Sequence, residues 1–225
     1  MAEFLVFTLA GAMGAFGDLA GHERRGSQLW PGRSAILGLI GAALGVRRDD
    51  APGQAELAIW RTAIGTLALG APFRDFHTAQ AVPTARIRRP NSRREALAAL
   101  KPSDNPVLTL RDYVTDCAFA VALWGGDGRA LADALSAPRF TPYLGRKACP
   151  LAMPMAPRLV EAETPVAAMA YAARPRWAET AAVGAVASDD YPGLSGLREV
   201  RWDDPADRAT WSFRPRSVIH LEGGT

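Results

Sequence analysis

The sequence predicts an α+β fold, and three features of its 225 residues support that class. Short apolar runs rich in β-branched and aromatic residues predict strands at 4–9 and 115–124. Apolar stretches bounded by capping residues predict helices at 35–45 and from 129 to about 137. Hydrophobic residues make up 48% of the chain and charged residues 22%, which is the balance of a folded globular protein and excludes a disordered chain or a coiled coil.

The first half of the chain predicts one strand, one helix and two further strands. The strand at 4–9 runs into a glycine cluster, which predicts a loop. Ser34 can cap the first helix and Gly45 can end it. Strand-like sequence then resumes at 57–69 and at 73–78.

A central strand at 115–124 and a helix from 129 complete the order strand, helix, strand, strand, helix. That order fits a split βαβ, ferredoxin-like layout, which RNA-recognition folds also have. Beyond Pro138 prolines become frequent and only short strands are expected, so a smaller β-rich carboxy-terminal part is predicted. Its candidate strands are 166–171, 180–187, 197–202 and 218–221.

The segment from 79 to 106 has no apolar face that could join a core, contains four prolines, and carries an arginine cluster. The cluster consists of Arg86, Arg88, Arg89, Arg93 and Arg94. Loops of this length are usually functional or disordered. Two interpretations stay open, a solvated loop and an extended arm that holds phosphates.

Every cation except Lys101 and Lys147 is an arginine. Arginine suits bidentate phosphate contacts and stacking on bases. GC-rich coding enriches arginine as well, so position along the chain has to decide. Cys117 and Cys149 belong to no cysteine or histidine ligand cluster, and we therefore expect no metal and no cofactor.

The amino terminus lacks a basic leader, and no apolar run approaches the ~20 residues that a membrane span needs. A cytoplasmic protein without a membrane partner is therefore expected.

The three histidines, His22, His77 and His220, accompany no serine or cysteine nucleophile motif. His77 ends a predicted strand, where it could hydrogen-bond to the chain or to RNA, or act as a general base on a ribose 2′-hydroxyl. A metal-independent endoribonuclease and a stand-alone, sequence-tolerant RNA-binding module therefore remain alternatives.

The string from Arg139 to Pro150 combines cations, an aromatic ring and a glycine. Its cations are Arg139, Arg146 and Lys147, and Tyr143 and Gly145 lie between them. A loop of this composition can hold a phosphate and stack a base at once.

Over most of residues 4–150 the sequence resembles the CasD subunits of type I-E Cascade, a CRISPR surveillance complex. The resemblance lies in five ordered strings, Leu9–Met13, Arg33–Asp50, Asp75–Thr78, Leu110–Tyr113 with Ala120, Leu123 and Trp124, and Thr141–Leu151. In the carboxy-terminal third it is confined to Arg216–Ile219 and the pair Gly223 and Gly224.

This resemblance implies a modified ferredoxin-like domain over 1–150, a protruding thumb insertion at about 79–109, and a small β-rich domain over 151–225. It also implies a non-catalytic subunit that binds the 5′ handle of the CRISPR RNA, caps the filament of backbone subunits and docks the large subunit that reads the protospacer-adjacent motif. Double-stranded DNA would be a partner through the complex. Related subunits of another subtype cleave precursor RNA, which keeps the endoribonuclease alternative open.

The expected RNA-binding residues combine these strings with the arginine cluster. They are Gly11, Met13, Arg33, Ser34, His77, Thr78, Arg86, Arg88, Arg89, Arg111, Tyr143, Leu144, Gly145, Arg146 and Lys147. No catalytic residue is expected.

Overall fold

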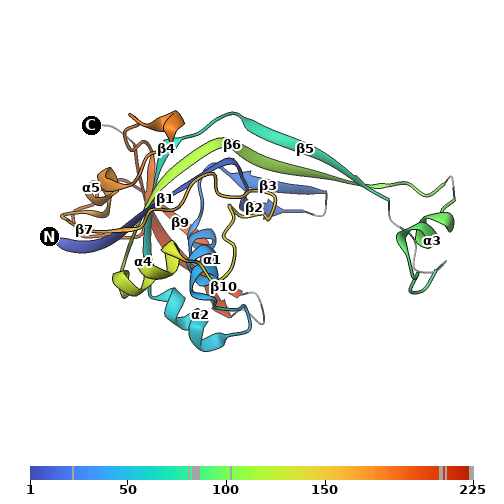
Figure 1. Ribbon diagram of the computed structural model, residues 1–225, viewed down its shortest axis with the longest axis horizontal. Helices are drawn as coiled ribbons and strands as arrows, with labels where there is room; N and C mark the ends of the chain where they lie inside the picture. Colours follow the sequence, from blue (N-terminus) through green and yellow to red (C-terminus); the bar gives the residue numbers. More distant parts are fainter. Residues whose placement is uncertain are drawn as a thin grey trace.

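The computed structural model describes residues 1–21, 23–80, 82, 87–101, 103–207, 210 and 212–222. One large sheet forms the body, helices cover both of its faces, and a long two-stranded arm projects from it (Figure 1). The elements are β1 (Ala2–Gly14), β2 (Phe16–Ala20), β3 (Arg24–Gln28), α1 (Arg33–Leu44), α2 (Ala51–Ala58), β4 (Arg61–Ala68), β5 (Pro72–Ala79), α3 (Arg93–Ala98), β6 (Val107–Trp124), α4 (Gly128–Ser136), β7 (Arg158–Ala162), α5 (Pro165–Ala168), the 3₁₀ turns η1 (Met169–Tyr171) and η2 (Arg176–Ala178), β8 (Val186–Ser188), β9 (Leu197–Asp207) and β10 (Ser212–Leu221).

The centre of the body is an antiparallel run of strands in the order β7, β1, β6, β4. Leu9 pairs with Phe119 between β1 and β6, and Ile64 of β4 pairs with Val121. The predicted α+β class is confirmed. Along the chain, α1 lies between β1 and β4, and α4 lies between β6 and β7.

Strand β6 divides the interior into two cores, because its successive side chains point to opposite faces of the sheet. Phe119, Val121 and Leu123 join the core beneath α1 and α4, and alanines 118, 120 and 122 join the core on the α5 side. The large residues therefore meet two long helices, whereas the alanines leave room for α5 and η1 to pack closely.

The arm consists of β5 and the first half of β6, with α3 at its outer end (Figure 1). It begins at Pro72, earlier than the predicted insertion, because exposed strands lack the apolar density that identifies buried ones. Asp116 lies where the arm meets the body and has a φ of 44°, although the register of β1 with β6 continues unchanged past it. The register shift lies on the other side of β6, between Thr66 and Ala68 of β4, and we interpret it as a bulge at Leu67.

The region that was expected to be a glycine loop followed by a polar stretch folds as the hairpin β2–β3. Arg24 and Arg25 of β3 pair in parallel with Leu110 and Arg111 of β6, at the base of the arm. The expectation of a loop was wrong because this hairpin is polar and its stability depends on pairing with β6, which no local pattern reveals.

Two other local predictions were wrong. Ser34 does not cap α1, because the helix begins one residue earlier at Arg33 with Gly32 as its N-cap. The strand predicted at 57–69 is confirmed as β4 over 61–68, but its start was wrong, because Asp50 accepts a hydrogen bond from the Gly53 N–H and starts α2, which extends to Ala58. The predicted end of α1 is confirmed, since Gly45 is left-handed with a φ of 78°.

The carboxy-terminal residues extend the same sheet. Strand β7 pairs with β1, β8 pairs with β4, and β10 and β9 continue outward from β8. A domain boundary at 150 therefore has no counterpart in the sheet, and the proline-rich texture there marks a connecting loop. The strand expected at 166–171 is α5 and η1, which Thr164 caps through the Ala167 N–H. Of 180–187 only the last two residues enter a strand, whereas β9 and β10 confirm the last two candidates.

Candidate nucleic-acid interface

Cations gather where the arm leaves the body. Arg24 and Arg74 both bind the carboxylate of Asp112, with nitrogen–oxygen distances of 2.9 and 2.6 Å, and their own side chains are 60% and 50% exposed. Hydrogen bonding from Arg74, aided by Arg24, lowers the pKa of Asp112 to about 2. We call this region the junction surface and define it as Arg24, Arg25, Arg74, Arg111, Asp112, Arg146 and Lys147. It surrounds the base of the arm, because Arg74 and Asp112 lie on one face of the ladder and Arg111 lies on the other.

Arg146 fastens the loop that follows Tyr143 to this surface. Its guanidinium lies 4.6 Å from the centre of the Tyr113 ring and donates hydrogen bonds to the carbonyls of Arg25 and Asp112. Lys147, next in the chain, is exposed. The loop thereby adds one anchored and one free-standing cation to those of β3 and β5.

Residues 143–150 form a tight turn whose shape depends on Gly145. Leu144 donates to the Cys149 carbonyl at 2.8 Å, and the Cys149 N–H donates to Arg146 at 2.8 Å. Gly145 has a φ of 81°, and a Cβ there would lie 1.7 Å from the Ala15 carbonyl oxygen. Only glycine can occupy this position without moving the loop.

Two members of the predicted set are interior packing residues. The Leu144 side chain is 1% exposed and both of its backbone groups are hydrogen-bonded within the protein. Gly11 is buried on β1, where a Cβ would lie 2.7 Å from Leu144 Cδ1. The prediction that these two residues contact RNA is corrected: they shape the loop from beneath. Met13 is half-buried against the same core.

Arg33 is also turned inward, in contrast to its predicted position on a phosphate. Its side chain is 3% exposed and its Nη1 lies 3.1 Å from Asp204, while Nη2 donates to the carbonyls of Ala58 and Trp60. Burial lowers the pKa of Arg33, and the charges of Asp189 and Asp204 oppose this shift. Arg33 therefore ties α1 to β9, and only Ser34 beside it is exposed.

The neighbours His77 and Thr78 lie on opposite faces of the arm, because paired side chains in an antiparallel ladder share a face. His77 pairs with Thr109 and shares its face with Arg111, which is opposite Asp75. Thr78 shares the other face with Phe76 and Leu108. The predicted RNA-binding residues of the arm therefore lie on two opposite faces. His77 and Arg111 are on the face that carries Tyr113, and Thr78 is on the other.

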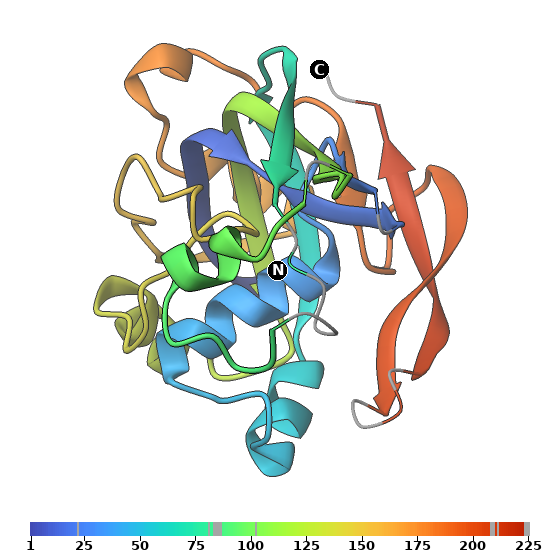
Figure 2. The same cartoon turned by 90° about the vertical axis from the view of Figure 1, so that its right-hand side faces the viewer.

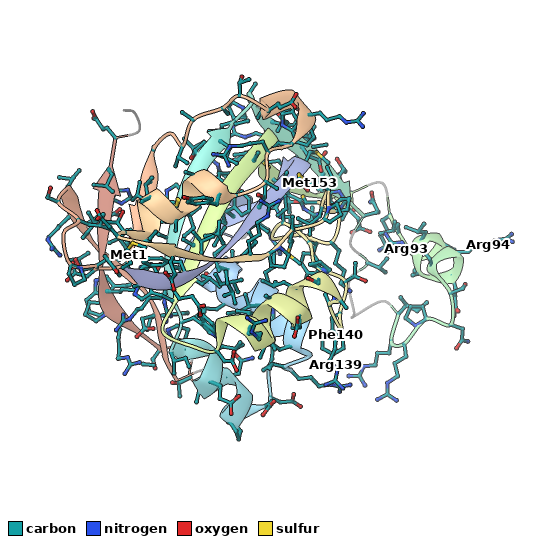
Figure 3. The ribbon with its side chains drawn as sticks, turned by 60° about the vertical axis from the view of Figure 1, so that its left-hand side comes forward. Met1, Arg93, Arg94, Arg139, Phe140 and Met153 are labelled. Atoms are coloured by element: carbon teal, nitrogen blue, oxygen red, sulfur yellow. The ribbon has the colours of Figure 1, made fainter. Side chains whose placement is uncertain are left out.

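The arginine cluster lies at the outer end of the arm. Arg88 and Arg89 are exposed, Arg86 lies outside the described residues, and Arg93 donates to the Gln80 carbonyl at 2.6 Å. Figure 3 shows Arg94 pointing away from the body, with Arg139 and Phe140 on the side of the body that faces the arm. The structure thus gives two cationic regions, one at the base of the arm and one at its tip.

Sequence reasoning missed Arg24, Arg25 and Arg74, which contribute three of the six cations of the junction surface. Each lies in a strand with little apolar alternation, so the local signal is weak. What brings them together is the pairing of β3 and β5 with β6.

Within the described residues no three histidine, cysteine or acidic side chains form a group that could hold a metal ion. Burial raises the pKa of the Cys117 thiol to about 11, which disfavours the reactive thiolate. No helix in the described part of the chain is long and apolar enough to cross a membrane.

Residues 4–219 match the family described as CRISPR-associated protein (Cas_Cas5). The chain belongs to this family. It is 34% identical over 173 residues to the CRISPR system Cascade subunit CasD of Escherichia coli (strain K12), covering 69% of this chain and 70% of the relative. The resemblance to CasD subunits is therefore confirmed.

Two solved structures share the fold over almost the whole chain. A chain of a CRISPR RNA-guided surveillance complex is 27% identical, covers 99% of this chain and 90% of its own length, and gives a TM-score of 0.69. A crystal structure of a Cas protein is 23% identical, covers 97% of this chain and 94% of its own, and gives a TM-score of 0.61. The second likeness concerns the fold alone.

Proposed function

We propose that this chain is the RNA-binding subunit of a type I-E Cascade complex and holds the 5′ handle of the guide RNA. The observation that carries the proposal is the junction surface, where six cations from three strands and one loop surround the base of the arm and outnumber its two carboxylates, Asp112 and Asp75. The excess positive charge favours a phosphate backbone.

The junction surface is organised before RNA arrives. Asp112 holds Arg24 and Arg74 in place, and Tyr113 holds Arg146. Cations that are already ordered lose less conformational entropy when they bind a phosphate than free surface side chains do. Tyr143, with a 40% exposed ring, supplies a stacking group beside them.

The arm suits the proposed role of a thumb that reaches backbone subunits at the end of the filament. Its tip carries exposed arginines, and one of its faces exposes Phe76 by 62% and Leu108 by 46%. Apolar side chains at this exposure are suited to a protein partner. Docking of the large subunit, and contact with double-stranded DNA through the complex, belong to the same proposal.

A non-catalytic role fits the geometry of the arm. Cleavage of RNA without a metal needs a base at the 2′-hydroxyl and an acid at the leaving oxygen of the same linkage. His77 pairs with Thr109, and Tyr113 lies four residues further along β6, about 13 Å away at strand spacing. Tyr113 is also only 7% exposed, so the two residues are poorly placed to act on one linkage.

The test uses two exposed cations of the junction surface, with a charge-matched control. Arg25→Ala with Lys147→Ala should raise the Kd of the assembled complex for handle RNA about 10- to 100-fold, roughly 1.4 kcal/mol per factor of ten. The slope of log Kobs against log salt concentration should also become less steep, by about 0.7 for each lost phosphate contact. Arg129→Ala with Arg158→Ala removes two exposed cations elsewhere on the body. Equal affinity of both double variants would refute the assignment.

A further inference from the structure

A second feature lies beside the junction surface, in a groove of about 620 Å³ along α1. Figure 2 shows α1 with the hairpin β9–β10 on one side and the segment that follows α4 on the other. The loop 140–145 lines the groove from the body, and Pro205, Ser212 and Phe213 line it from the hairpin. Its volume lies within the range of about 300–1,000 Å³ typical of small-molecule sites.

Three aromatic rings along the groove are partly open to solvent. Phe140 is 44% exposed, Tyr143 40% and Phe213 38%. Between them the exposed side of α1 offers Ser34 and Gly38, and an added Cβ at Gly38 would meet nothing within 4 Å. A flat group can therefore approach the helix while aromatic rings flank it.

The charge at the groove favours an anionic occupant. Arg47 and Arg48 lie at its α2 end, both exposed, and none of the described residues that line it is acidic. Two acids of the neighbouring elements are already bound: Asp50 caps α2, and Asp204 pairs with Arg33 and Arg214. Aromatic rings with arginines and no carboxylate are the chemistry of single-stranded nucleic acid.

The hairpin wall is held in place by a buried ionic network. Arg216 pairs with Asp203 at 2.7 Å and with Asp189, while Arg33 links α1 to Asp204 at 3.1 Å. Burial alone would lower the pKa of Arg216, but the bonds to Asp203 and Asp189 outweigh burial and raise it. The network fixes the hairpin that carries Phe213 and Pro205 relative to α1.

The groove is continuous with the junction surface along the chain. Tyr143 and Gly145 line the groove, and Arg146 and Lys147 follow directly on the junction surface. We propose that the groove binds one or two unpaired nucleotides of the guide RNA, with a base stacked on Tyr143 and a phosphate at Arg47 or Arg48. This proposal rests on the proposed function and adds the carboxy-terminal hairpin to the RNA site.

The test fills the groove without weakening the fold. Gly38→Leu places a side chain in open space on a helix and replaces glycine by a better helix former, so the thermal midpoint should not fall. Ser136→Leu on the exposed side of α4 is the matched control. Handle RNA carrying 2-aminopurine at one unpaired position at a time reports stacking as loss of fluorescence on binding to the assembled complex.

One or two positions should be quenched in the wild type and in Ser136→Leu, and should recover in Gly38→Leu and in Tyr143→Leu. Gly38→Leu should also raise the Kd about tenfold. If Gly38→Leu keeps wild-type quenching and affinity while Arg25→Ala with Lys147→Ala still weakens binding, the groove is not an RNA site although the proposed function stands. If Gly38→Leu instead loses a protein subunit from the complex with RNA binding intact, the groove binds protein and the proposal is overturned.

Discussion

Strand β6 belongs to two regions of the molecule that differ sharply. From Cys117 to Leu123 every residue is buried, whereas from Val107 to Asp112 none is. In the body the strand is covered on both faces, so its stability comes from apolar burial. In the arm it pairs with β5 along its length and with β3 only at Leu110 and Arg111, and both faces are solvated, so cross-strand pairs such as Arg74–Asp112 hold it. The body therefore supplies stability, and the arm is free to vary in composition.

The largest expected effect separates the two halves of this strand. Phe119 is fully buried and packs edge-on against Phe16, with ring centres 5.4 Å apart. Phe119→Ala should lower the free energy of unfolding by about 3–5 kcal/mol. Phe76→Ala on the arm should change it by about 0.5 kcal/mol or less. Denaturant unfolding of the two variants measures the difference, and comparable losses would contradict the division into body and arm.

The next effect concerns two adjacent aspartates near the end of β8. Asp189 is 1% exposed, accepts from the Thr62 N–H at 2.7 Å and pairs with Arg216, whereas Asp190 forms an exposed pair with Arg198. Asp189→Asn should cost about 3 kcal/mol, because it leaves buried guanidinium charge without its partner. Asp190→Asn should cost below about 1 kcal/mol. Thermal unfolding of both variants measures the two losses. Equal losses of stability would show that burial of Asp189 is not the cause.

Shortening the arm should affect the body still less. Deleting residues 82–106 and joining the strands through a short turn removes one buried side chain among the described residues, that of Ala96. The free energy of unfolding of the body should change by less than about 1 kcal/mol. Incorporation into the Cascade complex should nevertheless fall, which native mass spectrometry can quantify. Full incorporation of the shortened chain would remove the arm from the assembly interface.

The smallest effect is a dependence of the arm on pH. Because the pKa of Asp112 is lowered to about 2 in the folded chain, its pairs with Arg74 and Arg24 stabilise the arm above about pH 4. This stabilisation should disappear as the pH falls from about 4 to about 2. Amide exchange of β5, corrected for the intrinsic rate, should differ between wild type and Asp112→Asn at pH 5 and coincide near pH 2. If the exchange of wild type and Asp112→Asn still differs near pH 2, the effect comes from the shape of the side chain and not from its charge.

The part of the fold that could be predicted from sequence follows the same division between buried and exposed strands. The buried half of β6, β1 and α1 were found because apolar density and capping are local signals. The strand predicted at 73–78 is confirmed as β5, but the hairpin β2–β3 and the first half of β6 were missed because polar strands are specified by their partners. Residue types alone cannot say which neighbour will lie beside an exposed strand.

The candidate site shows the same limit at the level of single residues. The turn around Gly145 was singled out by its combination of cations, glycine and an aromatic ring, and it lies on the surface of the body beside the arm. In sequence, Arg33 and Leu144 cannot be told apart from exposed neighbours. In the structure Arg33 pairs with Asp204, and Leu144 is buried in the core. The guanidinium of Arg33 contacts Asp204 of β9, which lies 171 residues away along the chain, so no local pattern reveals this contact.

The bulge at Leu67 sets the register of the arm against β6. The pairing of β4 with β6 is regular from Arg61–Trp124 to Thr66–Phe119, and after one extra residue it resumes at Ala68–Ala118, in the register that β5 continues from Pro72–Val114. Because paired side chains share a face, moving β5 by one position would exchange the faces of neighbouring residues. Phe76 would then join Arg111 and His77 would move to the opposite face, so an aromatic ring would lie where polar side chains now gather.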